Sequence, residues 1–480
     1  MARIKFGTGG WRAIIGDEFI RANVRLLAAA LATRMQDEGV AGEGIVIGYD
    51  RRFLSDVAAE WAAEVFAGYG IPTQVIKVAQ APTPLIMWTV KDRDFPYGMA
   101  ITASHNPALY NGIKVFTRGG KDADEDVTLD VERRMEALEG AREADIPSVA
   151  YAKAIASGEI QEVNTFNGYI DSIISQIDME AIREAGLKVA LDPMFGVSKT
   201  SLQTILMTAR VDVEVINDRH DTLFGGRLPS PTSHTLQALS RFVVENHGDL
   251  GIATDGDADR IGIIDDKGNF LHPNQLLVIL YWYLLKYKGW KGAVVRNVAT
   301  TSLLDDLAAK FGEQAYEVPV GFKWISGKML ETDAIIGGES SGGLTVRGHI
   351  SGKDGIYAAA LLVEMIAVVG KPMSQIYEEI TGQFPPHYMA ETDFAFDPER
   401  KPEILNTLMV EKKLPEFCEP VVRTSYEDGC KVYFEEGWII ASSSSCSSSM
   451  SPTTISTMSS SEARPSVPPY SSMTSAMWVR

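Results

Sequence analysis

Cysteine, long apolar runs and positive charge are all scarce in this chain. The three cysteines, Cys418, Cys430 and Cys446, are too few and too scattered for a disulfide framework or a cysteine metal site. The longest unbroken apolar run, Leu276 to Leu285, has ten residues, whereas a helix needs about 20 to cross a bilayer. The N-terminal residues contain no apolar stretch of the secretory type, so we expect a cytoplasmic protein.

The charge balance excludes two further classes of partner. Lysine and arginine together number 45, against 63 aspartates and glutamates, which gives a formal net charge of −18. A surface this acidic repels phosphodiester backbones and anionic lipids. We therefore expect neither a nucleic-acid partner nor a membrane partner.

The length and the sequence pattern predict a globular protein with several α/β layers. At about 150 residues per domain, 480 residues favour about three domains. Short apolar runs alternate with helical patterns, which is typical of α/β architecture. Strands are predicted at 44–50, 74–78, 98–104, 187–192, 211–216, 249–255 and 292–296, and helices at 21–35, 55–69, 274–286, 302–311 and about 355–369. The acidic stretch 122–147 is interpreted as irregular.

The last forty residues differ from the rest of the chain, since sixteen of them are serine. Such a composition buries too little apolar surface to offset chain entropy, so residues 442–480 are predicted to be disordered. The change occurs abruptly after 437–441, within a predicted strand. A shifted reading frame or a sequencing error produces such a change, and a natural low-complexity tail is the alternative.

Ser104 occupies the end of a predicted strand, within Thr102-Ala-Ser-His-Asn-Pro107. A serine in a loop stiffened by proline can be held at the mouth of a pocket. The same pattern also suits an N-cap turn, and no Gly-x-Ser-x-Gly elbow supports acyl hydrolysis.

Asp255, Asp257 and Asp259 alternate along a short predicted loop, Asp255-Gly-Asp-Ala-Asp-Arg260. Three carboxylates this close repel one another unless they share a cation, and oxygen ligands suit Mg²⁺ or Ca²⁺. An EF-hand is excluded because Arg260 replaces the required glycine and Asp266 the required glutamate. A solvated acidic turn is the alternative.

A glycine-rich turn, Gly337-Gly-Glu-Ser-Ser-Gly-Gly343, follows the apolar strand predicted at 334–336. Glutamate accepts hydrogen bonds and serine both donates and accepts them, so such a turn can bind sugar hydroxyls. A plain flexible loop is the alternative.

Four motifs stand in one order along the chain: residues 7–12 (Gly-Thr-Gly-Gly-Trp-Arg), 102–107 with 111–114 (Asn-Gly-Ile-Lys), 255–260, and 338–343. Together they resemble the α-D-phosphohexomutase family, the phosphoglucomutases and phosphomannomutases, over about residues 1–440. The resemblance implies interconversion of hexose 1-phosphate and hexose 6-phosphate, of glucose or mannose. It implies a phosphoserine, a bisphosphate intermediate, Mg²⁺, and hexose 1,6-bisphosphate as activator.

The resemblance also implies the roles of individual residues. Ser104 would be the phosphoserine and, with Asp255, Asp257 and Asp259, would hold Mg²⁺. The other implied residues are Arg12 and Lys114 near the transferring phosphoryl group (Lys114 as general acid/base), Arg260 neutralising phosphate charge, and Glu339, Ser341 and Lys323 in substrate binding. The Lys353-Asp-Gly355 segment also looks similar to the family, without an assigned role.

The implied fold is three similar α/β domains with mixed sheets around a central cleft, plus a smaller, incomplete α+β fourth domain. We place these domains at 1–145, 146–268, 269–372 and 373–441, followed by the tail at 442–480. The partners would be small-molecule hexose phosphates, and the protein a monomer or homodimer.

One departure from the family concerns substrate affinity. Members of that family carry a Ser-Gly-Thr-Glu-Pro-type loop and a nearby arginine that clamp the non-reacting phosphate, and here the serine-rich tail replaces them. Impaired activity of this chain is therefore expected. Two alternatives to the mutase are also open: a non-catalytic phosphosugar-binding protein and a haloacid-dehalogenase-like phosphatase. The phosphatase is favoured by Asp255-Gly-Asp257 after an apolar strand, but Asp259 replaces the usual threonine or valine and Ser104 would be unexplained.

Overall fold

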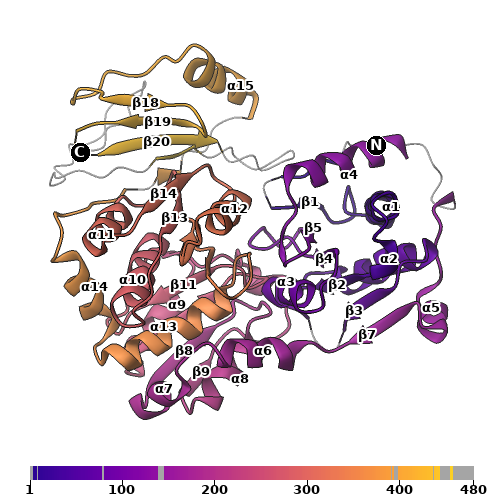
Figure 1. The fold of residues 1–480 in the computed structure, drawn as a ribbon, viewed down its shortest axis with the longest axis horizontal. Coiled ribbons are helices and arrows are strands. Elements are labelled where there is room, and N and C mark those ends of the chain that lie inside the picture. The colour runs from indigo at the N-terminus through magenta and orange to yellow at the C-terminus, as the bar shows by residue number, and fades with distance from the viewer. Residues whose placement is uncertain are drawn as a thin grey trace.

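The computed structural model describes residues 4–7, 9–77, 80–138, 145–390, 392–393, 398–435, 437–443 and 455–457. Within these residues the strands form four separate sheets. Figure 1 shows the first sheet in indigo and the last in yellow, with the last sheet next to β13 and β14. The predicted class, three α/β units with mixed sheets and a smaller fourth unit, is confirmed.

The first unit contains a mixed sheet in the order β1-β5-β4-β2-β3-β7, with β6 paired to β5. Its central strands β2, β3 and β4 run parallel, whereas β1, β5 and β6 are antiparallel to their neighbours. The elements are β1 (Trp11–Ile14), α1 (Arg21–Asp37), β2 (Ile45–Tyr49), α2 (Ser55–Gly68), β3 (Thr73–Ile76), α3 (Thr83–Asp92), β4 (Tyr97–Ile101), β5 (Tyr110–Thr117), β6 (Lys121–Asp122), α4 (Glu125–Ala137), α5 (Tyr151–Ser157) and β7 (Ile160–Val163).

Two features of this unit differ from the sequence predictions. The stretch interpreted as irregular contains helix α4, because Val127, Val131 and Met135 recur at helical spacing and are buried. Acidic side chains on the opposite face conceal this pattern in the composition. Strand β7 pairs with β3 beyond the expected boundary at residue 145, so the first sheet extends at least to Val163.

The second and third units follow the same plan with smaller sheets, in the orders β12-β11-β10-β8-β9 and β14-β13-β15-β16. The second unit comprises α6 (Phe166–Ile174), α7 (Met179–Ala185), β8 (Lys188–Asp192), α8 (Lys199–Thr208), β9 (Asp212–Val215), α9 (Gln237–Glu245), β10 (Leu250–Thr254), β11 (Ile261–Ile264) and β12 (Phe270–Leu271). The third comprises α10 (Pro273–Lys286), β13 (Val294–Asn297), α11 (Leu303–Phe311), β14 (Ala315–Val318), α12 (Phe322–Thr332), β15 (Ile336–Gly338), β16 (Leu344–Val346), α13 (Gly355–Val369) and α14 (Met373–Thr381).

A single apolar cluster joins the three units. It contains buried residues of α3 from the first unit, α6 and α8 from the second, and α10 and α13 from the third. The apolar run Leu276 to Leu285 is therefore the interior of a core helix, with every residue buried. Among the described residues no single helix is long and apolar enough to cross a membrane. Helices α13 and α14 together have sufficient length and apolar composition, but the chain bends by 81° between them.

The fourth unit is a small sheet in the order β17-β21-β20-β19-β18. Its elements are β17 (Thr392–Asp393), α15 (Lys401–Leu405), β18 (Arg423–Ser425), β19 (Cys430–Tyr433), β20 (Trp438–Ser443) and β21 (Ile455–Thr457). Two pieces of the serine-rich tail are extended strand here: β20 continues to Ser443, and β21 pairs with it. The rest of that tail lies outside the described residues, where its disorder stays a prediction.

Candidate active site

Ser104 lies in the loop between β4 and β5, where its backbone is strained. Its φ of 50° is in the left-handed region, and the residue is 1% exposed. For a non-glycine residue this conformation costs of order 1–3 kcal/mol and persists only where surrounding contacts fix it. One such contact is the backbone N–H of Ser104, which donates to Thr102 Oγ1 at 2.9 Å, while Thr102 donates to Asp50 Oδ2 at 2.7 Å.

Arg52, in the segment after strand β2, holds the Ser104 loop. Its guanidinium donates to the carbonyl oxygens of Ser104 and Asn106, both at 2.6 Å, and pairs with Asp50 at 3.3 Å. Further bonds reach the carbonyl oxygens of Pro107 and Tyr110. The sequence analysis missed Arg52; the only signal was two arginines at the end of a buried strand.

The three aspartates lie on the hairpin that joins β10 to β11. Asp255, Asp257 and Asp259 are 0 to 1% exposed, and one carboxylate oxygen of each lies within 4.8 Å of the others. Ser104 Oγ donates to Asp255 Oδ2 at 2.6 Å. The structure thus brings the predicted serine and the predicted metal loop into direct contact, although 151 residues separate them.

Lys114 reaches this loop from β5. Its Nζ is 2.7 Å from Asp257 Oδ2 and 2.6 Å from Asp259 Oδ2. Lys353, to which the sequence assigned no role, places its Nζ 3.2 Å from the same oxygen of Asp259. Thr83, which the sequence analysis missed, donates to Asp257 Oδ2 at 2.6 Å.

Burial and the charges in this cluster shift the pKa values of Asp255 and Asp259 in opposite directions. Burial, then Asp257 and Asp259, raises the pKa of Asp255 well above its ordinary value. Burial also acts to raise the pKa of Asp259, but Lys114, Lys353 and Arg260 outweigh it and hold this pKa well below its ordinary value. Burial opposes the charge of Lys114, yet Asp257 and Asp259 raise the pKa of Lys114 above its ordinary value. Lys114 is therefore an ammonium in this arrangement.

The predicted sugar-binding turn lies against the metal loop. Ile261 N donates to the Gly342 carbonyl at 3.2 Å, and a bridge joins Arg260 to Gly343. Glu339 is 8% exposed, and its Oε1 accepts from the backbone N–H of Gly321 at 3.1 Å. Ser341 Oγ is 3.4 Å from Glu339 Oε2.

Three further predicted residues, Arg260, Arg12 and Lys323, differ in how near they lie to the carboxylate cluster. Arg260 Nε is 3.9 Å from Asp259 Oδ1. Arg12, on β1 opposite Gly112 of β5, is close enough to oppose the positive charges of Lys114 and Arg52. Lys323 is not in the carboxylate cluster, because its Nζ pairs at 3.1 Å with Glu125 of α4, across the contact between the first and third units.

Two buried oxygens test whether this loop suits a metal. Asp257 Oδ1 and Asp259 Oδ1 have no hydrogen-bond partner among the described residues, although buried carboxylate oxygens are normally paired. Carboxylate oxygens are the ligands that Mg²⁺ prefers. The residues therefore fit a divalent cation of this kind.

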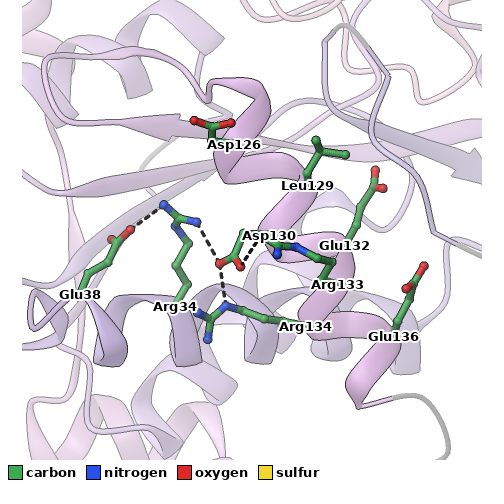
Figure 2. Close-up of a pocket in the computed structure, with 9 residues that line it drawn as sticks. All are labelled: Arg34, Glu38, Asp126, Leu129, Asp130, Glu132, Arg133, Arg134 and Glu136. Atoms are coloured by element: carbon green, nitrogen blue, oxygen red, sulfur yellow. Dashed lines mark hydrogen bonds and ion pairs between the residues drawn. The ribbon is translucent and has the colours of Figure 1, made fainter.

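A hollow away from this cluster, shown in Figure 2, is lined by residues of α1 and α4 and by Glu38, all of them charged except Leu129. Its volume is about 600 Å³. Asp130 accepts from Arg34 at 2.9 Å and from Arg134 at 2.7 Å, and Arg34 also pairs with Glu38 at 2.7 Å. These charges satisfy one another, and the hollow includes none of the predicted site residues.

A fixed serine, three carboxylates and two lysine side chains thus meet beside the turn predicted to bind sugar, an arrangement typical of α/β enzymes that transfer phosphoryl groups. Three family models, described as phosphoglucomutase/phosphomannomutase alpha/beta/alpha domains I, II and III, match residues 3–142, 167–268 and 272–384. The chain belongs to the phosphoglucomutase/phosphomannomutase family. Its relatives are mutases, that is, isomerases that move a phosphoryl group within the substrate.

The relatives are distant but similar over almost their whole length. A phosphoglucomutase/phosphomannomutase of Thermococcus kodakarensis is 29% identical, over 92% of this chain and 91% of the relative. A Pyrococcus furiosus protein named a probable phosphoglucosamine mutase is 30% identical, over 91% and 90%. The crystal structure of a Thermus thermophilus protein assigned as a phosphomannomutase superposes with a TM-score of 0.81 at 28% identity, covering 95% of each chain.

Proposed function

We propose that this chain interconverts hexose 1-phosphate and hexose 6-phosphate, with Ser104 as the residue that carries the phosphoryl group. The observation that supports this most directly is the 2.6 Å bond from Ser104 Oγ to Asp255, on a loop whose other two carboxylates each keep an unpaired buried oxygen. A phosphoryl group on Ser104 would be next to the charges of Lys114, Lys353 and Arg260.

Two transfers complete the proposed reaction. In the first, the bond between phosphorus and Ser104 Oγ breaks while a bond forms to the free hydroxyl oxygen of the sugar phosphate, which gives a hexose 1,6-bisphosphate. The bisphosphate then turns over in the site, and Ser104 Oγ takes the other phosphoryl group. Added hexose 1,6-bisphosphate would phosphorylate an unloaded Ser104, and therefore act as an activator.

Lys114 is the proposed proton-transfer residue. Its raised pKa keeps it charged, so it attracts the equatorial oxygens of the phosphoryl group. It would donate a proton to the Ser104 oxygen that leaves phosphorus and then take up the proton that the attacking sugar hydroxyl releases, so that it ends each transfer as it began. Glu339 and Ser341 would accept and donate hydrogen bonds to sugar hydroxyls. A turn with so few polar groups suits a sugar that must bind in two opposite orientations.

The family depends on Mg²⁺, and we propose that Ser104, Asp255, Asp257 and Asp259 hold one ion. When bound, Mg²⁺ offsets negative charge that develops on the phosphoryl oxygens. A structure of the Aspergillus fumigatus N-acetylphosphoglucosamine mutase with GlcNAc-6P and magnesium has the same fold, with a TM-score of 0.52 at 13% identity. It supports a hexose phosphate and a magnesium ion as the ligands of this fold.

Three sugars are candidates, because relatives are named for glucose, mannose and glucosamine phosphates. A coupled assay with the 1-phosphates of all three, at saturating Mg²⁺ and glucose 1,6-bisphosphate, measures the preference. Phosphate on Ser104 by peptide mapping and turnover of at least one substrate are expected. A chain that binds sugar phosphates by calorimetry but turns none over would instead be the non-catalytic binding protein.

A further inference from the structure

Three buried polar side chains meet behind the metal loop, at the junction of the three α/β units. Tyr169 is on α6, the first helix after the first sheet, while His349 and Asp354 flank the loop between β16 and α13. Their exposures are 0%, 4% and 1%. Tyr169 OH donates to Asp354 Oδ2 at 2.8 Å, and His349 Nε2 is 2.6 Å from the same oxygen.

Asp354 has its hydrogen-bonding capacity filled locally. Its Oδ1 accepts from the backbone N–H groups of Ile356 and Tyr357, at 2.8 and 2.9 Å, and so caps α13. Burial, then the charge of Asp354, raises the pKa of Tyr169 well above its ordinary value, so the phenol keeps its proton and donates it. With four donors on its two oxygens, Asp354 does not need the neighbouring lysine as a partner.

The surroundings of His349 determine which ring nitrogen carries the proton. Asp354 Oδ2 is a carboxylate oxygen and accepts, so we assign a hydrogen to the His349 Nε2 that faces it at 2.6 Å, while Gln176 Nε2 is 3.4 Å from His349 Nδ1. The carbonyl oxygen of His349 also accepts from Lys91 Nζ of α3. The first unit is thereby tied to this loop as well.

The backbone directly after Lys353 is fixed by two hydrogen bonds. Asp354 N donates to the Leu344 carbonyl at 3.0 Å, next to the sugar-binding turn, and Gly355 N donates to the Ala258 carbonyl at 3.1 Å, inside the metal loop. A Cβ on Gly355 would be 2.8 Å from the Arg260 carbonyl oxygen, so only glycine permits this approach. Lys353, 13% exposed, then has Asp259 Oδ2 at 3.2 Å.

We propose that Tyr169, His349 and Asp354 are positioning residues that hold the Lys353 ammonium at the metal loop during phosphoryl transfer. The inference rests on the proposed function for its kinetic consequence, but the placement of Lys353 can be measured without turnover. A lysine has many rotamers, so a fixed backbone and a neighbouring carboxylate with no spare acceptor both favour the placement in which the Lys353 ammonium contacts Asp259 and lies over the Phe322 ring. Removing a donor from Asp354 frees an acceptor that competes for Lys353.

The first test compares Tyr169→Phe with Tyr281→Phe, each of which removes one buried hydroxyl. Tyr281 OH donates to the Gly292 carbonyl at 3.1 Å, a bond between two residues outside both the network and the predicted site. In Tyr169→Phe we expect kcat to fall about tenfold or more with KM changed less than twofold, because a small displacement of a reacting-site group costs rate. Tyr281→Phe should leave both constants unchanged at a similar loss of melting temperature.

The second test measures Lys353 directly, as its rate of acylation by acetic anhydride followed by peptide mass spectrometry. We expect faster labelling of Lys353 in Tyr169→Phe and in His349→Ala, wild-type labelling in Tyr281→Phe, and partial recovery in His349→Gln, whose amide can still donate. Faster labelling in a chain without mutase activity would refute the proposed function and support the positioning network. Unchanged labelling in both Tyr169→Phe and His349→Ala would overturn the network.

A double-mutant cycle supplies the remaining control. If Tyr169 acts through Lys353, Tyr169→Phe should have little further effect on kcat in a Lys353→Ala background. Fully additive losses would show that Tyr169 acts on the enzyme by another route, and would contradict the proposal.

Discussion

At the scale of single residues, the site depends on Ser104 Oγ being fixed on a strained loop. We predict that Ser104→Ala lowers kcat by about 10³-fold or more, since the group that carries the phosphoryl is removed. A coupled mutase assay and intact mass measurement check this, and the mass shift of one phosphate should disappear. Ser201→Ala, which alters a buried serine of α8, should keep both activity and phosphate. Full activity in Ser104→Ala would refute the mechanism.

A second residue-scale prediction concerns the metal. Asp257→Asn preserves volume but removes one carboxylate charge, so the Mg²⁺ concentration for half-maximal activity should rise about tenfold or more. Titration of activity with Mg²⁺ after treatment with a chelator measures this. Asp192→Asn is the matched control, because Asp192 is buried at the end of β8 with both oxygens hydrogen-bonded, to Met194 N and Asn217 Nδ2. An equal Mg²⁺ requirement in the two variants would contradict the assignment.

At the scale of helices and strands, the sequence correctly predicted the elements in which most residues are apolar. The helix at about 355–369 and the strand at 249–255 match α13 and β10 closely, because nearly all their residues are buried. Helix α4 was missed because its apolar side chains are a minority among acidic ones. The acidic loop was recognised as a motif, but its contacts to Thr83 and Lys353 cross between units and leave no local signal.

The contact between β14 and β19, which joins the fourth unit to the third, is polar and partly buried. Glu317 Oε2 accepts from Lys431 at 2.8 Å and from Arg296 at 2.6 Å, and Lys431 is 3% exposed. Replacing the carboxylate with an amide removes the negative charge that offsets Lys431, whose other buried neighbours are the Val298 carbonyl at 2.8 Å and the Trp438 ring at 4.2 Å. We predict that Glu317→Gln lowers the free energy of unfolding by about 3 kcal/mol. Glu214→Gln, which breaks the exposed pair with Lys188, should cost less than about 1 kcal/mol.

The same contact predicts a pH dependence of stability. Burial acts to raise the pKa of Glu317, but Arg296 and Lys431 outweigh it and hold the pKa below the ordinary value of 4.5. Because the folded pKa is lower than the unfolded one, the stabilisation is fully present above about pH 4.5 and is lost as pH falls through the folded value. The difference in melting temperature between wild type and Glu317→Gln should therefore shrink in acid. A difference that grows in acid would show that Glu317 is not the stabilising anion.

At the scale of the whole molecule, the three α/β units form one body and the fourth is attached to it mainly along β14 and β19. The larger core includes residues of all three α/β units, whereas Trp438 and Ile440 form a small cluster with Val298. Substrate binding that needs the fourth unit can therefore fail while the rest of the molecule stays folded. The serine-rich tail makes this separation testable, since it begins within β20, after Ala441.

We predict that replacing the residues after Ala441 with an Arg-x-Ser-Gly-Thr-Glu-Pro sequence and a family-like ending lowers KM about a hundredfold. Two charge-assisted hydrogen bonds to the non-reacting phosphate, each worth about 1.5 kcal/mol or more, account for that factor. The kcat should rise as well, because binding energy at the remote phosphate helps orient the reacting end. A chain whose tail is replaced by a glycine-serine linker of equal length is the control and should keep the original kinetics. If the original chain already equals the restored one in kcat/KM, the tail does not impair substrate binding, and the phosphate is held by residues of the first three units.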